Sequence, residues 1–238
     1  MTAEPEPAAP PESTRPRPGG TRPAGADPSG RPPEAGPSRV EPLTRLERPD
    51  VRAHVLRAAL LAIDEVGPER VRVRDIAERA GMSSGHVMYY FGRRDRILVS
   101  TLLLSEDELA ERRTAELAAV ADPREAAVRF AELYLPAGAK DVRWRLWAQA
   151  VARPPEDEET LTRIAGFAGT WVRELAGIVT RGIGAGLFRP IGDAEGHARR
   201  ACRVMDSLAN DVLLGLPGCD AAWARDQAVQ EIMCGIGS

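Results

Sequence analysis

Hydrophobic positions recur at intervals of three and four residues through most of the chain after residue 43, which is the spacing of one face of an α-helix. In the segment 51–66 this pattern places Val51, Val55, Ala58, Ala62 and Val66 on a common face. The strict alternation typical of a half-buried strand does not occur, apart from the short run at 71–73. The pattern therefore predicts an all-α fold.

Aspartate, proline and glycine divide this pattern into separate helices, because these residues commonly begin or end helices. Asp50 is expected to cap the first helix, and Asp122 followed by Pro123 is expected to open a later one. Asp193 and Asp220 are the predicted caps of the last two helices. The predicted helices cover 51–66, 73–80, a helix starting at 83, a long one from 93 or 94 to about 113, 122–134, 141–152, 157–184, 193–214 and 220–234.

The segment 1–43 has a different composition, with 12 of the 20 prolines and hardly any large apolar residue. Such a segment cannot bury enough surface to offset its conformational entropy, so we expect a disordered tail. The alternative is an arm whose arginines touch DNA or a partner, although its glutamates nearly balance its arginines.

Charge and cysteine content narrow the class of protein. The formal net charge is −3, but residues 51–100 carry 9 basic and 6 acidic side chains (9 − 6 = +3), which makes this the only net-positive segment. The three cysteines, Cys202, Cys219 and Cys234, form no CxxC pair, and no apolar run reaches membrane-spanning length. We expect a soluble cytoplasmic protein without a metal, a cofactor or a membrane association.

The net-positive segment contains the organisation of a helix-turn-helix motif. Gly81 lies where a left-handed turn is needed, and Ser83 can cap the amides of the following helix. In this motif the second helix enters the major groove with its N-terminal residues against the base edges. The predicted base contacts are Ser84, Gly85, His86, Met88 and Tyr89.

Phosphate contacts are expected from the polar residues around this motif, since phosphates bind tyrosine hydroxyls, arginines and helix N-termini. The predicted phosphate contacts are Arg72, Ser83, Tyr90, Arg93 and Arg94. A helical hairpin that binds nothing is the alternative interpretation of the turn alone. The two tyrosines beside three arginines favour DNA binding, because a protein core has little use for them.

The segment 55–98 resembles the DNA-binding domain of TetR-family transcriptional regulators. The matching positions are Gly67, Val73, Ile76, Ala77, Ala80, Gly81, Met82, Ser83, Gly85, Val87, Tyr90, Phe91, Arg94, Asp95, Ile97 and Leu98. Three positions depart from the family pattern: Arg72 replaces a threonine, Met88 a tyrosine and Arg94 a lysine. The resemblance implies a DNA-binding domain at 44–98 and a larger helical domain at 99–238 that dimerises and holds a small-molecule effector.

In the larger domain, the apolar rows at 193–214 and 220–234 could meet a second copy as a four-helix bundle or bury within one chain. The residues predicted for a dimer interface are Ala198, Ala201, Met205, Leu208, Val212, Trp223, Ala228 and Ile232. Large aromatic residues either line a ligand pocket or build the core. Those predicted for the pocket are Phe130, Tyr134, Trp144, Trp147, Phe167 and Trp171.

Together these features predict a homodimeric DNA-binding transcriptional regulator, in particular a repressor that a small-molecule effector releases from a palindromic operator. The W-x-x-W helix and the GLFRP ending of the long helix are similar to the BetI-like branch of the family. The alternatives are a helical adaptor or an enzyme without DNA-binding activity. No HExxH or P-loop motif supports an enzyme.

Overall fold

The computed structural model describes residues 48–237, and this part of the chain is built from α-helices with no strand longer than an isolated bridge between Phe188 and Gly237. The predicted all-α fold is confirmed. The helices are α1 (Arg48–Val66), α2 (Val73–Arg79), α3 (Ser84–Phe91), α4 (Arg94–Ala118), α5 (Pro123–Tyr134), α6 (Val142–Ala152), α7 (Glu158–Gly184), α8 (Ala194–Leu214) and α9 (Ala221–Met233). The predicted tail at 1–43 lies outside the described residues.

Aspartates begin five of these helices, as side-chain acceptors for backbone amides that the helix leaves unpaired. Asp122, Asp193 and Asp220 accept hydrogen bonds from the amides of Arg124, Gly196 and Trp223, which confirms the predicted caps. Asp141 and Asp157 do the same for α6 and α7. The first helix differs from the prediction, because it starts at Arg48 and so includes Asp50 in its first turn.

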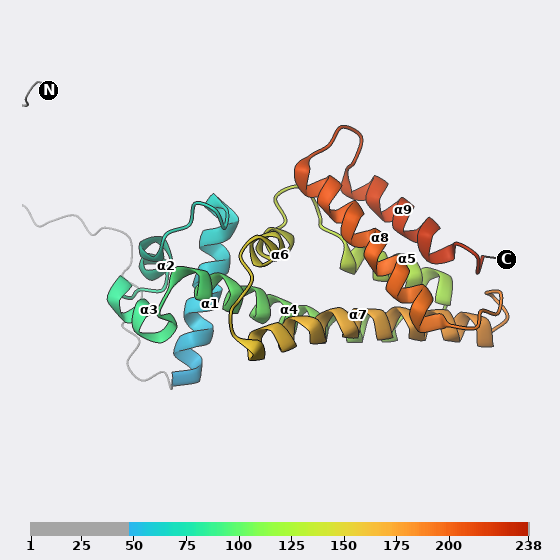
Figure 1. Cartoon of the computed structure of the whole chain (residues 1–238), viewed down its shortest axis with the longest axis horizontal. Helices are drawn as coiled ribbons and strands as arrows, with labels where there is room; N and C mark the ends of the chain where they lie inside the picture. Colours follow the sequence, from blue (N-terminus) through green and yellow to red (C-terminus); the bar gives the residue numbers. More distant parts are fainter. Residues whose placement is uncertain (1–47, 238) are drawn as a thin grey trace, which may run out of the picture. The chain divides into compact units, whose positions relative to one another are not determined.

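One hydrophobic cluster joins the first four helices, and α6 contributes to it. Its fully buried members include Ile63 of α1, Ile76 of α2, Val87 of α3 and Ile97 of α4, and Leu146 of α6 packs on them. Figure 1 shows α1, α2 and α3 packed around the start of α4, which continues away from them and lies beside α7. The motif-bearing helices are therefore held by the same element that runs on into the rest of the chain.

A second and larger cluster joins α4, α5, α7, α8 and α9. Leu175 of α7, Met205 of α8 and Ile232 of α9 are completely buried in it. Figure 1 shows α8 and α9 lying side by side, with α5 behind them and α7 below. The boundary predicted between residues 98 and 99 falls inside α4, and this division of the chain into domains stays a prediction.

Candidate nucleic-acid interface and ligand region

The corner between α2 and α3 is a Schellman motif, in which the last carbonyls of a helix are paired by the residues just past its end. The amide of Met82 donates to the Ala77 carbonyl at 2.9 Å, and the amide of Gly81 donates to the Glu78 carbonyl at 3.1 Å. Gly81 has a φ of 64°, the left-handed conformation that favours glycine. The predicted turn is confirmed.

The start of α3 is fixed by Ser83, whose hydroxyl oxygen accepts a hydrogen bond from the His86 amide at 3.2 Å. Ile76 and Ala77 of α2 pack with Val87 of α3, and all three are buried. The helix-turn-helix is therefore closed on its inner side, and the side chains of the opposite face of α3 point outward.

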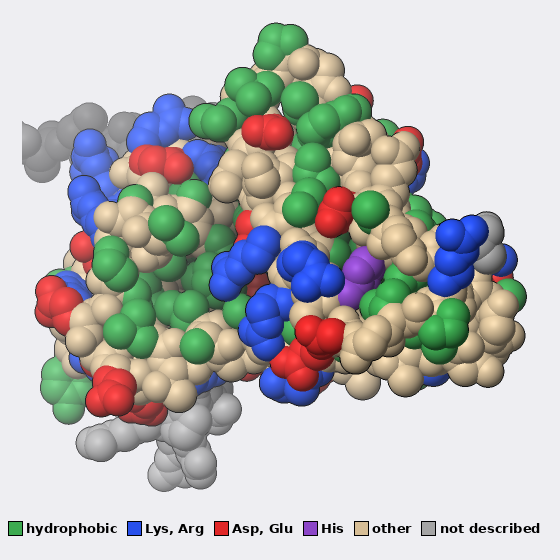
Figure 2. Space-filling view, turned by 45° about the vertical axis from the view of Figure 1, so that its right-hand side comes forward, with side chains coloured by type: hydrophobic (Ala, Val, Ile, Leu, Met, Phe, Trp, Pro, Cys, Tyr) green, Lys and Arg blue, Asp and Glu red, His purple; other side chains and the backbone are tan. Residues whose placement is uncertain are grey.

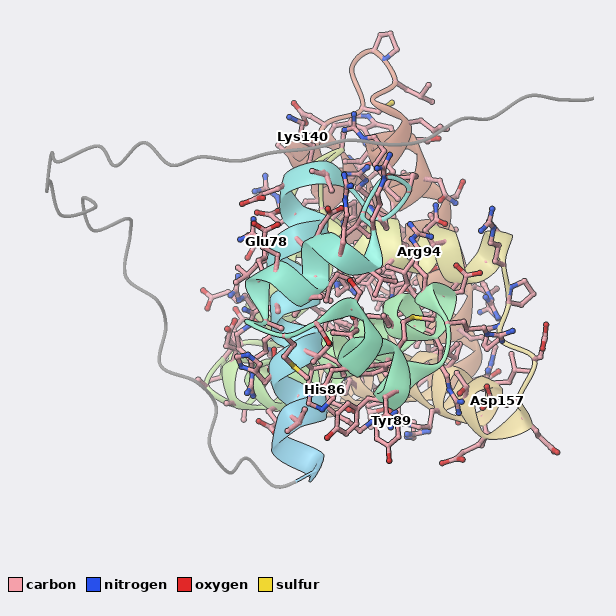
Figure 3. All side chains as sticks on the ribbon, turned by 90° about the vertical axis from the view of Figure 1, so that its left-hand side faces the viewer. Glu78, His86, Tyr89, Arg94, Lys140 and Asp157 are labelled. Carbon is pink, nitrogen blue, oxygen red and sulfur yellow. The ribbon has the colours of Figure 1, made fainter. Side chains whose placement is uncertain are left out.

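The outward face of α3 carries the exposed residues Ser84, Gly85, His86 and Tyr89. Tyr89 is 74% exposed, although large aromatic side chains are usually buried. Figure 3 shows His86 and Tyr89 on the outer face of this helix, with Tyr89 pointing away from the protein. Met88 and Tyr90 are partly buried, and the Tyr90 ring packs 5.3 Å from the His86 ring. The contacts of these side chains with DNA stay predictions.

Gly85 lies in the first turn of α3, where a glycine weakens a helix relative to alanine. A Cβ added at this position would meet nothing closer than the Ser83 hydroxyl oxygen at 4.0 Å. No neighbour within the described residues therefore requires a glycine here. A close approach by another molecule is a physical reason for the missing side chain.

Arg94 is turned into the protein, which differs from the predicted outward orientation toward phosphate. Its Nε donates to the Val71 carbonyl at 2.7 Å, and Nη2 donates to the Pro68 carbonyl. The side chain is 26% exposed, and these bonds fasten the loop between α1 and α2 to the first turn of α4. Arg94 is thus a residue that positions the motif.

Arg52 has a similar positioning role that the sequence pattern did not reveal. Its Nη1 donates to the Tyr90 carbonyl at 3.1 Å, and its guanidinium lies 4.8 Å from the centre of the Phe91 ring. The side chain on α1 therefore holds the C-terminal end of α3. An exposed arginine on an amphipathic helix gives no sequence signal for such a contact, because periodicity identifies a face and not its partner.

Arg72 and Arg93 lie at the starts of α2 and α4 and are exposed, as predicted for phosphate contacts. The side chain of Arg72 makes no capping bond, and its amide instead donates to the Asp75 carboxylate at 2.8 Å. The Arg93 guanidinium lies 3.5 Å from the Glu156 carboxylate in the segment between α6 and α7. An acidic segment thus lies beside this part of the predicted interface.

Four of the six predicted pocket residues pack against one another in the core. The rings of Phe130, Tyr134, Trp144 and Trp171 are buried, and the centroid of the Tyr134 ring lies 4.9 Å from Trp171 and 5.9 Å from both Trp144 and Phe130. Trp147 and Phe167 are partly exposed. For the four buried rings, the structure supports the alternative stated with the prediction, that they build the core.

Charged side chains penetrate this aromatic cluster. Arg113 is 2% exposed, pairs with Glu174, and lies with its guanidinium 3.7 Å from the centre of the Trp171 ring. The Tyr134 hydroxyl donates to Asp206 at 2.6 Å, and burial together with this carboxylate holds the Tyr134 pKa far above its ordinary value. Burial, and then Asp206, also raises the pKa of the Cys202 thiol to about 12.

Glu106 is a further buried charge at the edge of the aromatic cluster, and the sequence analysis did not single it out. Its Oε1 accepts hydrogen bonds from Trp147 Nε1 at 2.7 Å and from Arg143 Nη1 at 3.2 Å. From the sequence alone, a single glutamate on an amphipathic helix is expected to be exposed to solvent. Glu106 is buried because α6 packs on α4, which the sequence pattern does not show.

The predicted dimer residues lie inside the chain's own core, with one partial exception. Seven of them are buried, and Trp223 is partly buried against the same cluster. The seven buried side chains pack within the cluster of their own chain, which favours for them the stated alternative of burial within one chain, and the dimer interface stays a prediction. Figure 2 shows hydrophobic side chains and a few carboxylates over the upper part of the molecule, with a mixed group of basic and acidic side chains below them.

Across residues 48–237, no group of three or more histidine, cysteine, aspartate or glutamate side chains could hold a metal ion. None of the helices described is long and apolar enough to cross a membrane.

The geometry of α1–α4 defines a helix-turn-helix domain with an exposed second helix, joined to helices that build their own core. Residues 55–101 match the family model for "Bacterial regulatory proteins, tetR family". This match identifies residues 55–101 as a segment similar to the DNA-binding domain of that family.

The chain is also similar to curated regulators. The chain is 39% identical over 71 residues to the HTH-type transcriptional regulator BetI 2 of Chromohalobacter salexigens, which is 28% of this chain and 34% of that protein. It is 29% identical over 109 residues to BetI of Burkholderia mallei, which is 43% of this chain and 56% of that protein. The chain thus spans between a third and somewhat over half of these relatives. Their names describe regulators, in agreement with the prediction that the chain is not an enzyme.

Solved structures extend the similarity to the larger domain. A transcriptional regulator from Saccharomonospora viridis in complex with choline is 29% identical with a TM-score of 0.70, covering 80% of this chain and all of that one. FadR from Bacillus subtilis in complex with stearoyl-CoA is 20% identical with a TM-score of 0.58, covering 77% of this chain and 98% of that one. The second similarity is one of fold alone.

Proposed function

We propose that the chain is a sequence-specific DNA-binding regulator that presents α3 to the major groove. The observation that carries this proposal is the outward face of α3, where Tyr89 and His86 are exposed on a helix whose other face is buried. Gly85, which no neighbour requires, lets the duplex approach the first turn closely. Ser84, His86, Met88 and Tyr89 would contact the bases.

In this proposal the phosphates are held by residues around the ends of α2, α3 and α4. Arg72 and Arg93 supply exposed guanidiniums, Tyr90 its hydroxyl, and Ser83 lies at the N-terminus of α3, where a helix favours anions. Arg94 acts indirectly by holding the loop before α2.

The direct experiment is a gel-shift titration of the purified protein on DNA flanking its own gene, repeated across salt concentrations. Binding should weaken steeply as salt rises, because phosphate contacts release counterions. A folded protein that shifts no fragment would overturn the proposal. It would favour the alternative classes, a helical adaptor or an enzyme.

Replacing two residues of α3 should separate base contacts from phosphate contacts. Tyr90→Phe removes one hydroxyl and should weaken binding to specific and unrelated DNA alike, by roughly threefold to tenfold for one lost hydrogen bond. His86→Ala should change the ranking of operator variants, because base contacts carry specificity. If Tyr90→Phe altered only base preference, the phosphate role of Tyr90 would be wrong.

We further propose that the regulator acts as a homodimer on a palindromic operator, with half-sites about 34–36 Å apart or a multiple of that distance. Leu214, 73% exposed at the end of α8, and Val204 in its middle are hydrophobic side chains that a second copy could cover. Sedimentation analysis tests this. Leu214→Asp should shift the protein toward monomer, whereas Leu61→Asp, at an exposed leucine of α1, should not.

Repression with release by a small molecule is the regulatory scheme that we propose for this dimer. The regulator from Saccharomonospora viridis in complex with choline, with which this chain shares most of its length, supports a small organic molecule as effector. An effector can shift the protein away from the operator only by the difference between its affinities for the two conformations. Adding choline to the protein–DNA complex and measuring dissociation tests the scheme.

A further inference from the structure

Glu106 lies in the middle of α4 with its side chain only 1% exposed. Burying a carboxylate is costly unless its oxygens are paired. Both partners of this carboxylate, the Trp147 indole and the Arg143 guanidinium, donate to the same oxygen, Oε1. Within the described residues, the other oxygen, Oε2, is buried and has no hydrogen-bond partner. The arrangement therefore leaves one strong acceptor for a donor from outside the chain.

Aromatic faces surround the Arg143 guanidinium beside this carboxylate. Its central carbon lies 5.3 Å from the centre of the Trp144 ring and 6.0 Å from that of Trp171. Cations bind favourably over aromatic faces at such distances, most strongly when they are shielded from water. The chain's own guanidinium thus occupies a position that is built for a cation, with Glu106 as its counter-charge.

Arg143 also lines a groove of about 510 Å³ on the outer side of this site, which is within the usual size range of small-molecule pockets. Four carboxylates border the groove, against two guanidiniums besides Arg143. Those carboxylates belong to Glu108, Glu116, Glu132 and Asp141, and the guanidiniums to Arg112 and Arg129. With Arg143 counted, the border has a small net negative charge, and Glu116 and Glu132 pair with Arg129. Among the described residues that line the groove, Arg143 is the one whose side chain is hydrogen-bonded to Glu106.

We propose that Glu106 is the anchor of a binding site for a small organic cation that also carries a hydroxyl or N–H donor. The cation enters from the groove, displaces the Arg143 guanidinium from the aromatic faces, and donates its hydrogen bond to Oε2. A quaternary ammonium group without a donor would gain the cation–aromatic contact and leave Oε2 unpaired. This inference rests on the proposed function in one respect, namely that the site at Glu106 is the one that binds the effector.

The experiment measures binding directly, by calorimetry and by tryptophan fluorescence, in the absence of DNA. The probes are choline, which has a hydroxyl donor, and tetramethylammonium, which has none. Choline should bind at least tenfold more tightly than tetramethylammonium, since a hydrogen bond to a charged group distinguishes them. Glu106→Gln should weaken choline binding at least tenfold.

Glu111→Gln is the matched control, because it makes the same change at an exposed position of α4. It should change choline affinity by less than about twofold. Circular dichroism and the Tm of each variant establish that it is folded. If Glu106→Gln does not fold, Glu106→Asp takes its place in the experiment. This variant keeps the charge and should retain part of the affinity for choline.

Equal affinities for the two probes would overturn the donor requirement, and equal losses in Glu106→Gln and Glu111→Gln would overturn the site. Absence of choline binding to a folded protein that still shifts DNA would overturn the inference while leaving the proposed DNA binding intact. Choline binding by a protein that shifts no DNA would support the site at Glu106 and overturn the proposed DNA binding.

Discussion

At the scale of single residues, the arginines of the first four helices divide into two groups that look identical in the sequence. Arg94 and Arg52 donate to backbone carbonyls and hold the motif together, whereas Arg72 and Arg93 are exposed. The difference arises because a guanidinium within reach of unpaired carbonyls gains several hydrogen bonds at once. Arginine content therefore locates a positive region, and only the structure shows which members are available to phosphate.

Replacing Arg94 should act primarily on the stability of the protein and not on direct contacts with DNA. Arg94→Met removes bonds to the carbonyls of Val71 and Pro68, and should lower the free energy of unfolding by about 1–3 kcal/mol. Chemical denaturation measures the loss. Arg96→Met, at an exposed position of the same turn, should change stability by less than about 0.5 kcal/mol. Equal effects in the two variants would show that the inward bonds contribute nothing.

At the scale of helices, the elements were largely predictable because their boundaries are set by local chemistry. Asp122 and Asp220 cap helices through amides two or three residues away, and Gly81 turns the chain within its own corner. The sequence could not show whether Met205 is covered by its own chain or by a second copy, because an apolar row marks a buried face without identifying what covers it. Glu106 was missed for a related reason, because its burial depends on another helix, α6.

The end of α7 depends on a close approach that only glycine allows. A Cβ at Gly182 would lie 2.0 Å from Cδ2 of the Phe188 ring, and Phe188 packs with Val179 and Ile236. Gly182→Ala should therefore destabilise the protein by about 1–3 kcal/mol through overpacking.

Gly166→Ala provides the control for this substitution, since it lies in the same helix with nothing within 4 Å of the added Cβ. It should leave stability unchanged or raise it by up to about 1 kcal/mol, because alanine favours helix. Thermal unfolding of both variants distinguishes the steric effect from the effect of helix propensity. A neutral Gly182→Ala would show that Phe188 can move aside.

At the scale of the whole described chain, charges of opposite sign meet beside the proposed DNA-binding face. Glu156 pairs with Arg93, and Arg153 lies 3.8 Å from Asp95, so the segment between α6 and α7 contacts the start of α4. Figure 3 shows Asp157, the cap of α7, on the same side of the molecule as Tyr89. The pKa of Asp157 lies below its ordinary value, mainly because of its hydrogen bond with Thr160 and to the smallest extent because of the charge of Arg96. A duplex bound to α3 would therefore approach carboxylates as well as guanidiniums.

Removing one of these carboxylates should strengthen DNA binding. Glu156→Gln releases Arg93 for phosphate and should raise affinity about twofold to fivefold, in line with the energy of an exposed ion pair. Gel shifts at increasing salt should show the difference shrinking as charges are screened. Glu125→Gln makes the same change in net charge at the start of α5 and should have less effect. An equal gain in both variants would indicate a general charge effect and no specific competition.

The uninterrupted length of α4 has a mechanical consequence. Twelve residues separate Arg94, which holds the loop before α2, from Glu106, so the two lie about 18 Å apart along a single rod. If that rod pivoted by about 10° around Glu106, its first turn would travel about 3 Å, close to the rise of one base pair of DNA. A displacement too small to disturb the core around Glu106 would thus be amplified into a change of register at the duplex.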